Sequence, residues 1–557
     1  MIDATSTEQP SLIERAAWSL AWLAILTTGV DVWGQWTAWP GMAIVSPLVV
    51  LTGLVGAVVL WSVGDPASKA LQRFAFAAAT GTVLATQGPA IGARSFYSTD
   101  SAAFNHVATQ LLLRGHDPYT SSMASAAQFL PTPADYWTYT ANGAHVTQVS
   151  YPAGSFLLQA PLMALGLHHL PTDWLDLAAW LVTGALLFAI LPRSIRWLAP
   201  VLLLADAYVG PFANGGTDAL FIPFLVVAVW QWDRFATATR PSMARWLSPV
   251  ALGVACSIKQ SPWFCVPFLL LGVALEARAA RTGVLRTTMR YASMTAGAFL
   301  VINSAFIVWD PGAWWHGTML PLLTPLVPDG QGLVTLALHG LSGGADLRLL
   351  SLAGGLVMLS LFAAMLLKYP SLKRTWLFAL PIVLFVPGRS LTSYLLDFFP
   401  VAVVAAVSVR PGSPDAALTM PTWARRSLIA TPMAGAVLLA TLALRSAPLV
   451  VTVDSLTTAD AHQAVAAVTV TVHNRSGRYV TPNFMYSLDG GHPSGFWHQS
   501  LVSGVLPLAP GGSATITIRP DAWTWAPQRG EYWLVEAYTS PDALSTSSPQ
   551  RWPFGPR

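Results

Sequence analysis

Long apolar runs separated by short polar loops dominate residues 1–446. A bilayer core about 30 Å thick requires roughly 20 apolar residues in a crossing helix. Runs of about this length lie at 42–63, 72–92, 173–191, 291–308, 348–367 and 427–446, and shorter ones lie at 197–212, 219–232, 246–258, 261–275, 375–388 and 391–408. This pattern predicts a polytopic α-helical membrane protein with about 13 crossings.

The pattern changes at about residue 447. The later segments VVTVDSL, AVAAVTVTVHN, SATITIRP and EYWLVEAY alternate apolar and polar residues, and turns rich in Gly and Pro separate them. This alternation is typical of short antiparallel strands with one buried face. We therefore expect a transmembrane domain at 1–446 and an all-β sandwich at 447–557. Its tryptophans can stack on sugar rings, but we favour the alternative that they fill the sandwich core or rest on the membrane: Trp497, Trp523, Trp525, Trp533 and Trp552.

The distribution of basic residues predicts which loops lie on which side of the membrane. The 557-residue chain is only 10% charged, and its net charge of +4 without a basic cluster argues against a nucleic-acid partner. Basic residues fall in every second loop, which the positive-inside rule assigns to the cytoplasm: 69–73, 193–196, 234–245, 278–290, 368–374 and 410–426. The alternate loops are then extracytoplasmic, provided that the apolar stretch 153–167 does not cross completely. We expect a multi-pass cell-membrane protein with a cytoplasmic N-terminus and an extracytoplasmic C-terminal domain.

The first outside loop, 93–152, carries the first candidate for chemistry. Apolar residues recur at helical spacing over 101–113, which predicts an amphipathic helix lying on the membrane. Asp100 is at the N-cap position and Gly115 at the C-terminal stop, so a capping role is the structural alternative to catalysis for Asp100. Asp117-Pro118 is typical of a turn.

Two cations lie inside apolar sequence. Lys259 is in ACSIKQSPWFCVPFLL and Arg389 is in LFVPGRSLTSYLLDFFP. A charge near the middle of a bilayer costs about 2.5–3.5 kcal/mol, so such residues face a partner or a cavity. Pairing with Asp397 or with a helix-end carbonyl is one alternative. A cavity facing outward and shared with carboxylates such as Asp218 is the other, and we favour it.

The order of seven motifs then resembles a known family: Asp100 with LLLRGHDPY, YPAGSFLLQAPL, GGTDALF, IKQSPWFCVPFLL, NSAFIVWDPGAWW, VPDGQGL and GRSLTSYLLDFFP. It is similar to the polyprenyl-phosphate-dependent glycosyltransferases of the GT-C superfamily, most of all to the bacterial mannosyltransferase-like group GT87, over about residues 15–410. The resemblance implies that Asp100 is the general base and that Lys259 and Arg389 face the donor phosphate. Ser101 follows Asp100, so the paired acidic motif of other GT-C groups is not evident.

The implied reaction moves a sugar, with inversion, from a polyprenyl-phosphate donor to a glycan or glycolipid acceptor outside the membrane. Within the resemblance, mannose is the first sugar expected and a pentose such as arabinose the second. The VPDGQGL loop departs from the Asn-Gln-Ser-Leu form of characterised mannosyltransferases, so the sequence leaves the sugar identity open. An activated lipid-phosphate sugar needs no nucleotide, and the sequence has no Gly-rich dinucleotide signal. We predict no metal ligands and leave a divalent cation open. Weaker substrate contacts are expected from Asp218, Tyr119, His316, His339 and Gln331, with His106 a further candidate for phosphate or hydroxyl contact.

Two other functions fit a polytopic chain with intramembrane charges. A transporter or lipid flippase would favour inverted repeats with matching broken helices, and we find no such symmetry. A sensor or assembly platform would depend on residues 447–557 rather than on Asp100.

Overall fold

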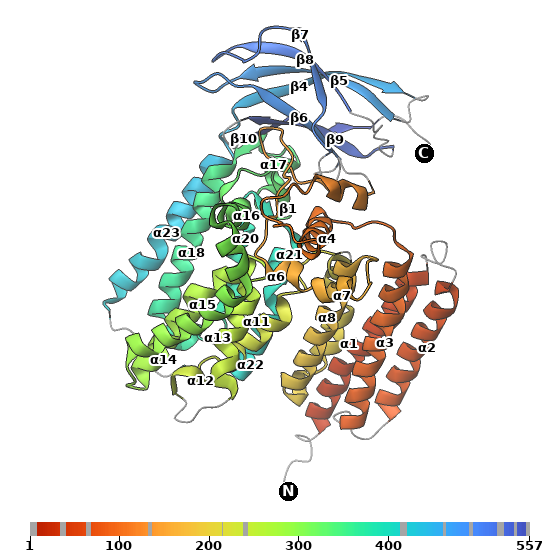
Figure 1. Ribbon diagram of the computed structural model, residues 1–557, viewed down its shortest axis with the longest axis vertical. Coiled ribbons are helices and arrows are strands. Elements are labelled where there is room, and N and C mark those ends of the chain that lie inside the picture. Colours follow the sequence, from red (N-terminus) through yellow and green to blue (C-terminus); the bar gives the residue numbers. More distant parts are fainter. Residues whose placement is uncertain are drawn as a thin grey trace.

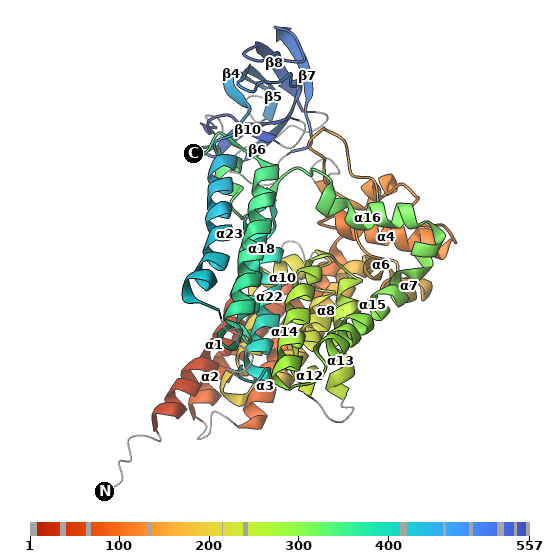
Figure 2. The same cartoon turned by 90° about the vertical axis from the view of Figure 1, so that its left-hand side faces the viewer.

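The computed structural model describes residues 8–33, 41–62, 68–131, 136–213, 215–237, 243–412, 420–459, 464–488, 494–520, 529–539 and 543–552. Its first part is helical, and the strand-rich C-terminal part is stacked on one end of the helices (Figure 1). A quarter turn shows α18 and α23 running up to these strands (Figure 2).

Seven helical segments within the described ranges are long and apolar enough to cross a membrane: α1 (Glu8–Trp33, apolar from Leu12), α2 (Met42–Ser62), α8 (Pro171–Ile190), η4 with α14 (Ser261–Cys265 and Val266–Ala279), α15 (Val284–Trp309), α18 (Leu347–Leu367) and α23 (Thr422–Ala443). Many of their large apolar side chains, such as Val301 and Val308, are exposed, as expected where lipid replaces water. The chain is therefore a helical membrane protein, whereas the count of about 13 crossings stays a prediction.

The remaining apolar segments are less apolar, shorter or interrupted: α3 (Lys69–Ala93), α9 (Leu198–Leu204), α10 (Asp206–Ala213), α11 (Ile222–Val229), α13 (Met243–Cys256), α20 (Trp376–Phe385), α21 (Thr392–Leu396) and α22 (Phe398–Ser408). The stretch 153–167 forms two short helices, α6 (Gly154–Leu157) and α7 (Ala160–Ala164). Helices of 4 and 5 residues cannot span a bilayer, in agreement with the incomplete crossing that the charge pattern requires.

Four short elements lie at the level between most of the long helices and the C-terminal strands: α4 (Asp100–Leu113), α16 (Pro311–Leu323), α17 (Thr335–Leu338) and β1 (Asp329–Gly330) (Figure 1). Two more pack against them, since η2 (Ala124–Phe129) contacts α4 and β3 (Arg389–Ser390) pairs with β1. The prediction that α4 lies on the membrane with one apolar face is wrong. Residues 101–109 are buried on all sides, and α4 packs among η2, α6, α7 and α8. The helix ends as expected, because Gly115 adopts φ +81° and its N–H bonds back to Leu112.

The C-terminal strands form two sheets. One has the order β4-β5-β8-β7, built from β4 (Leu449–Ala459), β5 (Ala464–Asn474), β7 (His498–Ser503) and β8 (Ser513–Arg519). The other has the order β11-β9-β10-β2 with β6 also on β9, built from β2 (Gly344–Asp346), β6 (Pro482–Leu488), β9 (Tyr532–Thr539), β10 (Ala543–Thr546) and β11 (Gln550–Arg551). Because β2 comes from the helical part, this sheet crosses the boundary that we expected at residue 447.

Both sheets contribute to one apolar cluster. Trp497, Trp533 and Trp552 are buried in it beside the valines of β5 and the isoleucines of β8. The core-filling interpretation is therefore confirmed for these three tryptophans, while Trp523 and Trp525 lie outside the described residues. The opposite face of the second sheet, with Met485, Tyr538 and Leu544, belongs to the same cluster as the helices.

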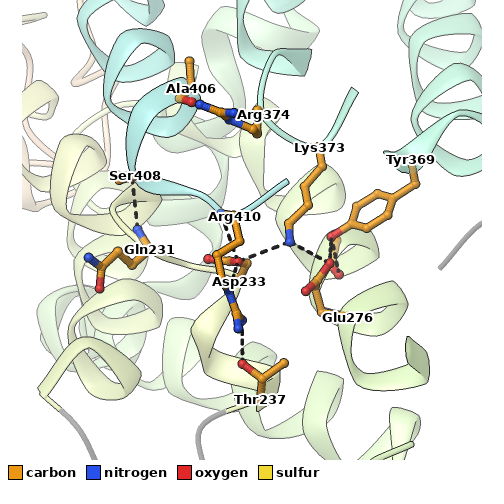
Figure 3. Close-up of polar contacts among 11 residues, drawn as sticks. Gln231, Asp233, Thr237, Glu276, Tyr369, Lys373, Arg374, Ala406, Ser408 and Arg410 are labelled. Atoms are coloured by element: carbon orange, nitrogen blue, oxygen red, sulfur yellow. Dashed lines mark hydrogen bonds and ion pairs between the residues drawn. The ribbon is translucent and has the colours of Figure 1, made fainter. Parts of the chain in front are cut away.

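The other end of the helical part is tied by a buried ionic network (Figure 3). Lys373 Nζ lies 3.2 Å from Asp233 Oδ2 and 2.9 Å from Glu276 Oε1, and Arg410 Nε lies 3.0 Å from Asp233 Oδ2. The hydroxyl of Tyr369 donates to Glu276 Oε1 at 2.8 Å. The two cations, Lys373 and Arg410, balance the two carboxylates, Asp233 and Glu276. The network therefore connects α14, which carries Glu276, to the segments that follow α19 (Tyr369–Leu372) and α22.

Candidate functional site

Asp100 is the first residue of α4, and it does not cap that helix. Thr99 is the N-cap, since its side-chain oxygen accepts the Ala102 N–H at 3.3 Å. The expectation that Asp100 is the cap is therefore wrong by one residue. Its Oδ2 accepts a hydrogen bond of 2.8 Å from the Thr138 N–H, and the residue keeps partial exposure. The carboxylate is thus available for a role other than capping.

Lys259 and Asp218 form a buried ion pair. Asp218 precedes α11 and Lys259 lies between α13 and η4, and the two side chains are 4% and 5% exposed respectively. The rings of Tyr151 and Tyr394 lie 5.4 and 5.3 Å from Lys259 Nζ. Burial alone lowers the pKa of Lys259, but Asp218 and the two tyrosines together raise it above its ordinary value. Lys259 therefore stays charged.

Arg389 is placed by a short parallel ladder. β1 pairs with β3, so that Asp329 is opposite Arg389 and Gly330 is opposite Ser390. Gly330 has φ +108°, and a Cβ there would lie 2.1 Å from the Ser390 carbonyl, so the close approach requires glycine. The Gln331 N–H donates to the Ser390 carbonyl at 2.8 Å, which places the VPDGQGL loop directly beside Arg389.

Hydrogen bonds between distant segments link the parts of the chain that carry these groups. Thr99 Oγ1 donates to the Gly215 carbonyl at 2.6 Å and joins α4 to the loop of Asp218. The Gly154 N–H donates to the Ser257 carbonyl at 2.8 Å and joins the segment of Tyr151 to that of Lys259. The first contact therefore holds the start of α4 near Asp218, and the second holds the segment of Tyr151 near Lys259.

The electrostatics identify the same cluster. Burial raises the pKa of Asp100 above its ordinary value, and the hydrogen bonds from Thr138 and the charge of Arg389 oppose part of that increase. Tyr151 lies within electrostatic reach of Lys259, Asp218 and Asp100. Asp100, Arg389 and the tyrosines keep partial exposure, unlike the Lys259–Asp218 pair. Asp100 and Arg389 are therefore closer to solvent than the ion pair is.

Three further buried carboxylates surround this cluster, and our sequence interpretation did not assign them to the site. Asp176 Oδ2 accepts from the Thr217 N–H at 3.1 Å, and Asp173 lies 3.6 Å from Arg94. Asp397 is fully buried, and neither of its oxygens has a hydrogen-bond partner among the described residues. The alternative that Lys259 pairs with Asp397 is wrong, because Asp218 is its partner. The signal for Asp173 and Asp176 was their i, i+3 spacing at the start of an apolar run.

Tyr119 and His316 line a separate hollow of about 420 Å³, formed by Tyr119, Thr120, Gln148, Gly312, Ala313, His316 and Gly317. It adjoins the main cluster, because the Tyr119 hydroxyl donates to the Tyr151 carbonyl at 2.8 Å. His339 lies farther along the chain at the end of α17, where the next residue, Gly340, packs against Ser547.

Two other residues that the sequence singled out, His106 and Asp117, have structural partners. His106 is buried, with Nδ1 2.8 Å from the Tyr97 hydroxyl and Nε2 2.9 Å from Gln110, and burial lowers its pKa to about 4. Asp117 Oδ1 accepts the Tyr119 N–H at 2.9 Å, which confirms the predicted turn.

Among the described residues, no group of three or more His, Cys, Asp or Glu side chains is arranged to hold a metal ion. No family model, no curated protein and no solved structure matches this chain. The function must therefore be argued from the site itself.

Proposed function

We propose that the protein is a membrane glycosyltransferase that moves a sugar from a polyprenyl-phosphate donor to a glycan or glycolipid acceptor on the extracytoplasmic side. The observation that carries this proposal is that Asp100 and Arg389, both partly exposed, lie within electrostatic reach of each other and beside the buried Lys259–Asp218 pair, with Tyr151 in reach of Asp100 and of that pair. Each group suits one task of the reaction.

The acceptor hydroxyl attacks the anomeric carbon while the bond from that carbon to the phosphate oxygen breaks. Asp100 takes the hydroxyl proton, an effect worth roughly 10²–10⁴ in rate. The phosphate leaves with the bonding electrons, and a cation stabilises its charge. Attack opposite the leaving phosphate inverts the anomeric centre.

Arg389 is the better candidate for the first phosphate contact. Arg389 forms no salt bridge with any described residue, whereas the charge of Lys259 is already balanced by Asp218. Arg389 also keeps partial exposure, while Lys259 is buried. In this proposal Lys259 orders the interior of the site, with Tyr151 and Tyr394 against it, and Arg389 meets the donor.

The remaining assignments extend the same scheme. Gln331, beside Arg389, and Asp218 contact the sugar or phosphate, and the hollow with Tyr119 and His316 takes part of a substrate. We propose that His339 has a peripheral contact, that the two C-terminal sheets form an extracytoplasmic sandwich, and that mannose is the first donor sugar to test.

The test uses purified protein with labelled polyprenyl-phosphate sugars and membrane acceptors. Wild-type protein transfers a sugar, and Asp100→Asn, which keeps the shape of the side chain, loses transfer while its melting temperature stays unchanged. Normal transfer by Asp100→Asn would reject the assignment of the base. If the wild type transfers no sugar from any of the donors, the proposal that the protein is a glycosyltransferase is rejected.

One observation favours a transporter as the second candidate. Asp173, Asp176, Asp218 and Asp397 are all buried, and buried carboxylates in a membrane are typical of proton or ion pathways. Proton or solute flux in reconstituted vesicles, lost in Asp397→Asn and independent of Asp100, would support that function instead.

A further inference from the structure

A small hairpin at residues 137–146, called here the Thr138 hairpin, lies between α4 and the C-terminal strands. Tyr139 and His145 form its antiparallel bridge, and the Val146 N–H donates to the Thr138 carbonyl at 3.0 Å. The ring of Trp137 packs on Phe104 of α4 with the ring centroids 5.5 Å apart. The hairpin therefore rests on the helix that begins with Asp100.

One residue of this hairpin holds the Asp100 carboxylate. The Thr138 N–H donates to Asp100 Oδ2 at 2.8 Å, and the Thr138 carbonyl is held by the other strand of the hairpin. A hydrogen bond to a carboxylate favours its charged form. The position of the hairpin thus affects both the orientation and the basicity of Asp100.

The C-terminal strands hold the other side of the hairpin. Phe496 lies edge-on to Tyr139 with the ring centroids 5.4 Å apart and to Tyr538 of β9 with the centroids 5.7 Å apart. Tyr538 is itself fixed, because it is fully buried and donates to Glu536 Oε2 at 2.5 Å. Phe496 therefore connects the hairpin to a central strand of the second sheet.

The same hairpin also binds the loop beside Arg389. The Val327 N–H donates to the Tyr139 carbonyl at 2.9 Å, and the Ala141 N–H donates to the Pro325 carbonyl at 2.9 Å. Two residues after Val327, the chain enters β1 and pairs with Arg389. A displacement of Tyr139 would therefore disturb both sides of the proposed site.

We propose that the C-terminal strand region is a positioning element of the active site, in which Phe496 presses on Tyr139 and so holds the Thr138 N–H against Asp100. This inference rests on the proposed function for its meaning, but its structural content can be measured without any substrate. Phe496 touches no reacting group in this scheme and acts only through the hairpin.

The central experiment compares Phe496→Ala and Phe496→Tyr in the full-length protein in nanodiscs. Tyr479→Ala is the matched control, because Tyr479 is an aromatic residue of the same region that is 70% exposed. Hydrogen–deuterium exchange of peptides covering residues 137–146 rises in Phe496→Ala, stays at the wild-type level in Phe496→Tyr, and does not change in the control.

The functional measurement is the pH dependence of sugar transfer. The rate falls by about tenfold to a hundredfold in Phe496→Ala, since a displacement of about 1 Å can cost that much. Loss of the Thr138 hydrogen bond raises the pKa of the base, so the acidic limb of kcat/KM moves to higher pH. The other groups facing Asp100 are Arg389 from β3 and Tyr151 from the segment before α6, and no variant alters them.

The outcomes separate this inference from the proposed function. A wild type without transfer would reject the function, while the exchange data would still test the hairpin. Unchanged exchange at 137–146 and an unchanged pH profile in Phe496→Ala would overturn the inference. If Phe496→Ala unfolds, Phe496→Leu replaces it, and a uniform rise of exchange over the whole protein in that variant would also overturn it.

Discussion

Variants of the buried pair of Lys259 and Asp218 can separate an effect on stability from an effect on sugar transfer. Both side chains are at most 5% exposed, and two rings cover the ammonium group. Lys259→Met leaves a buried carboxylate without its partner, and Asp218→Leu leaves a buried ammonium. Removing one member of such a pair costs about 3–5 kcal/mol, whereas replacing both by apolar residues of similar volume is often neutral or stabilising.

We therefore expect each single variant to melt well below the wild type in detergent and the double variant Lys259→Met/Asp218→Leu to recover most of the loss. Sugar transfer should not recover in the double variant, because the proposed function needs Lys259 to order the interior of the site and Asp218 to contact the sugar or phosphate. The assays are a thermal scan and transfer from a labelled lipid-phosphate sugar. Single variants as stable as the wild type would contradict the buried ion pair between Lys259 and Asp218. Full sugar transfer by the double variant would show that neither side chain is needed for the reaction.

Three further predictions concern other parts of the molecule. Gly330→Ala forces a Cβ against the Ser390 carbonyl at φ +108°, so we expect a lower melting temperature and weaker donor binding, measured by thermal scan and KM; unchanged values would contradict the close approach. Burial raises the pKa of Glu536 from 4.5 to about 7, so the folded state holds the proton more tightly than the unfolded state does. The free energy of unfolding should therefore fall by about 3 kcal/mol as the pH rises from about 4.5 through about 7. Glu536→Gln should remove this dependence in unfolding experiments at several pH values. Because burial raises the pKa of Asp100 and a base must be deprotonated, transfer should be lost with falling pH at values above the ordinary range of an aspartate; an acidic limb at or below that range would count against Asp100 as the base.

Several local features of the fold could be predicted because they depend on neighbours along the chain. Long apolar runs gave α2 and α18 to within one residue and the greater part of α15 and α23, whose more polar first turns lie outside the predicted runs. The change to alternating residues near 447 gave the C-terminal strands. The helix after Asp100 and its stop at Gly115 followed from spacing and glycine. Periodicity did not predict that α4 is buried on all sides, because it reports which face is apolar and not what covers the polar one.

The sequence by itself determined the class of the protein, a helical membrane protein with strands after residue 447, and it named Asp100, Asp218, Lys259 and Arg389 as candidates. Composition and period are enough for the class, since a bilayer accepts only certain lengths and patterns. The candidates came instead from charged residues within or beside apolar runs and from the motif resemblance. The tertiary structure alone decided that Lys259 pairs with Asp218, that Asp397 stays unpartnered among the described residues, and that Thr138 binds Asp100. Partners of this kind are 38 and 41 residues apart in the chain, and only packing brings them within hydrogen-bonding distance.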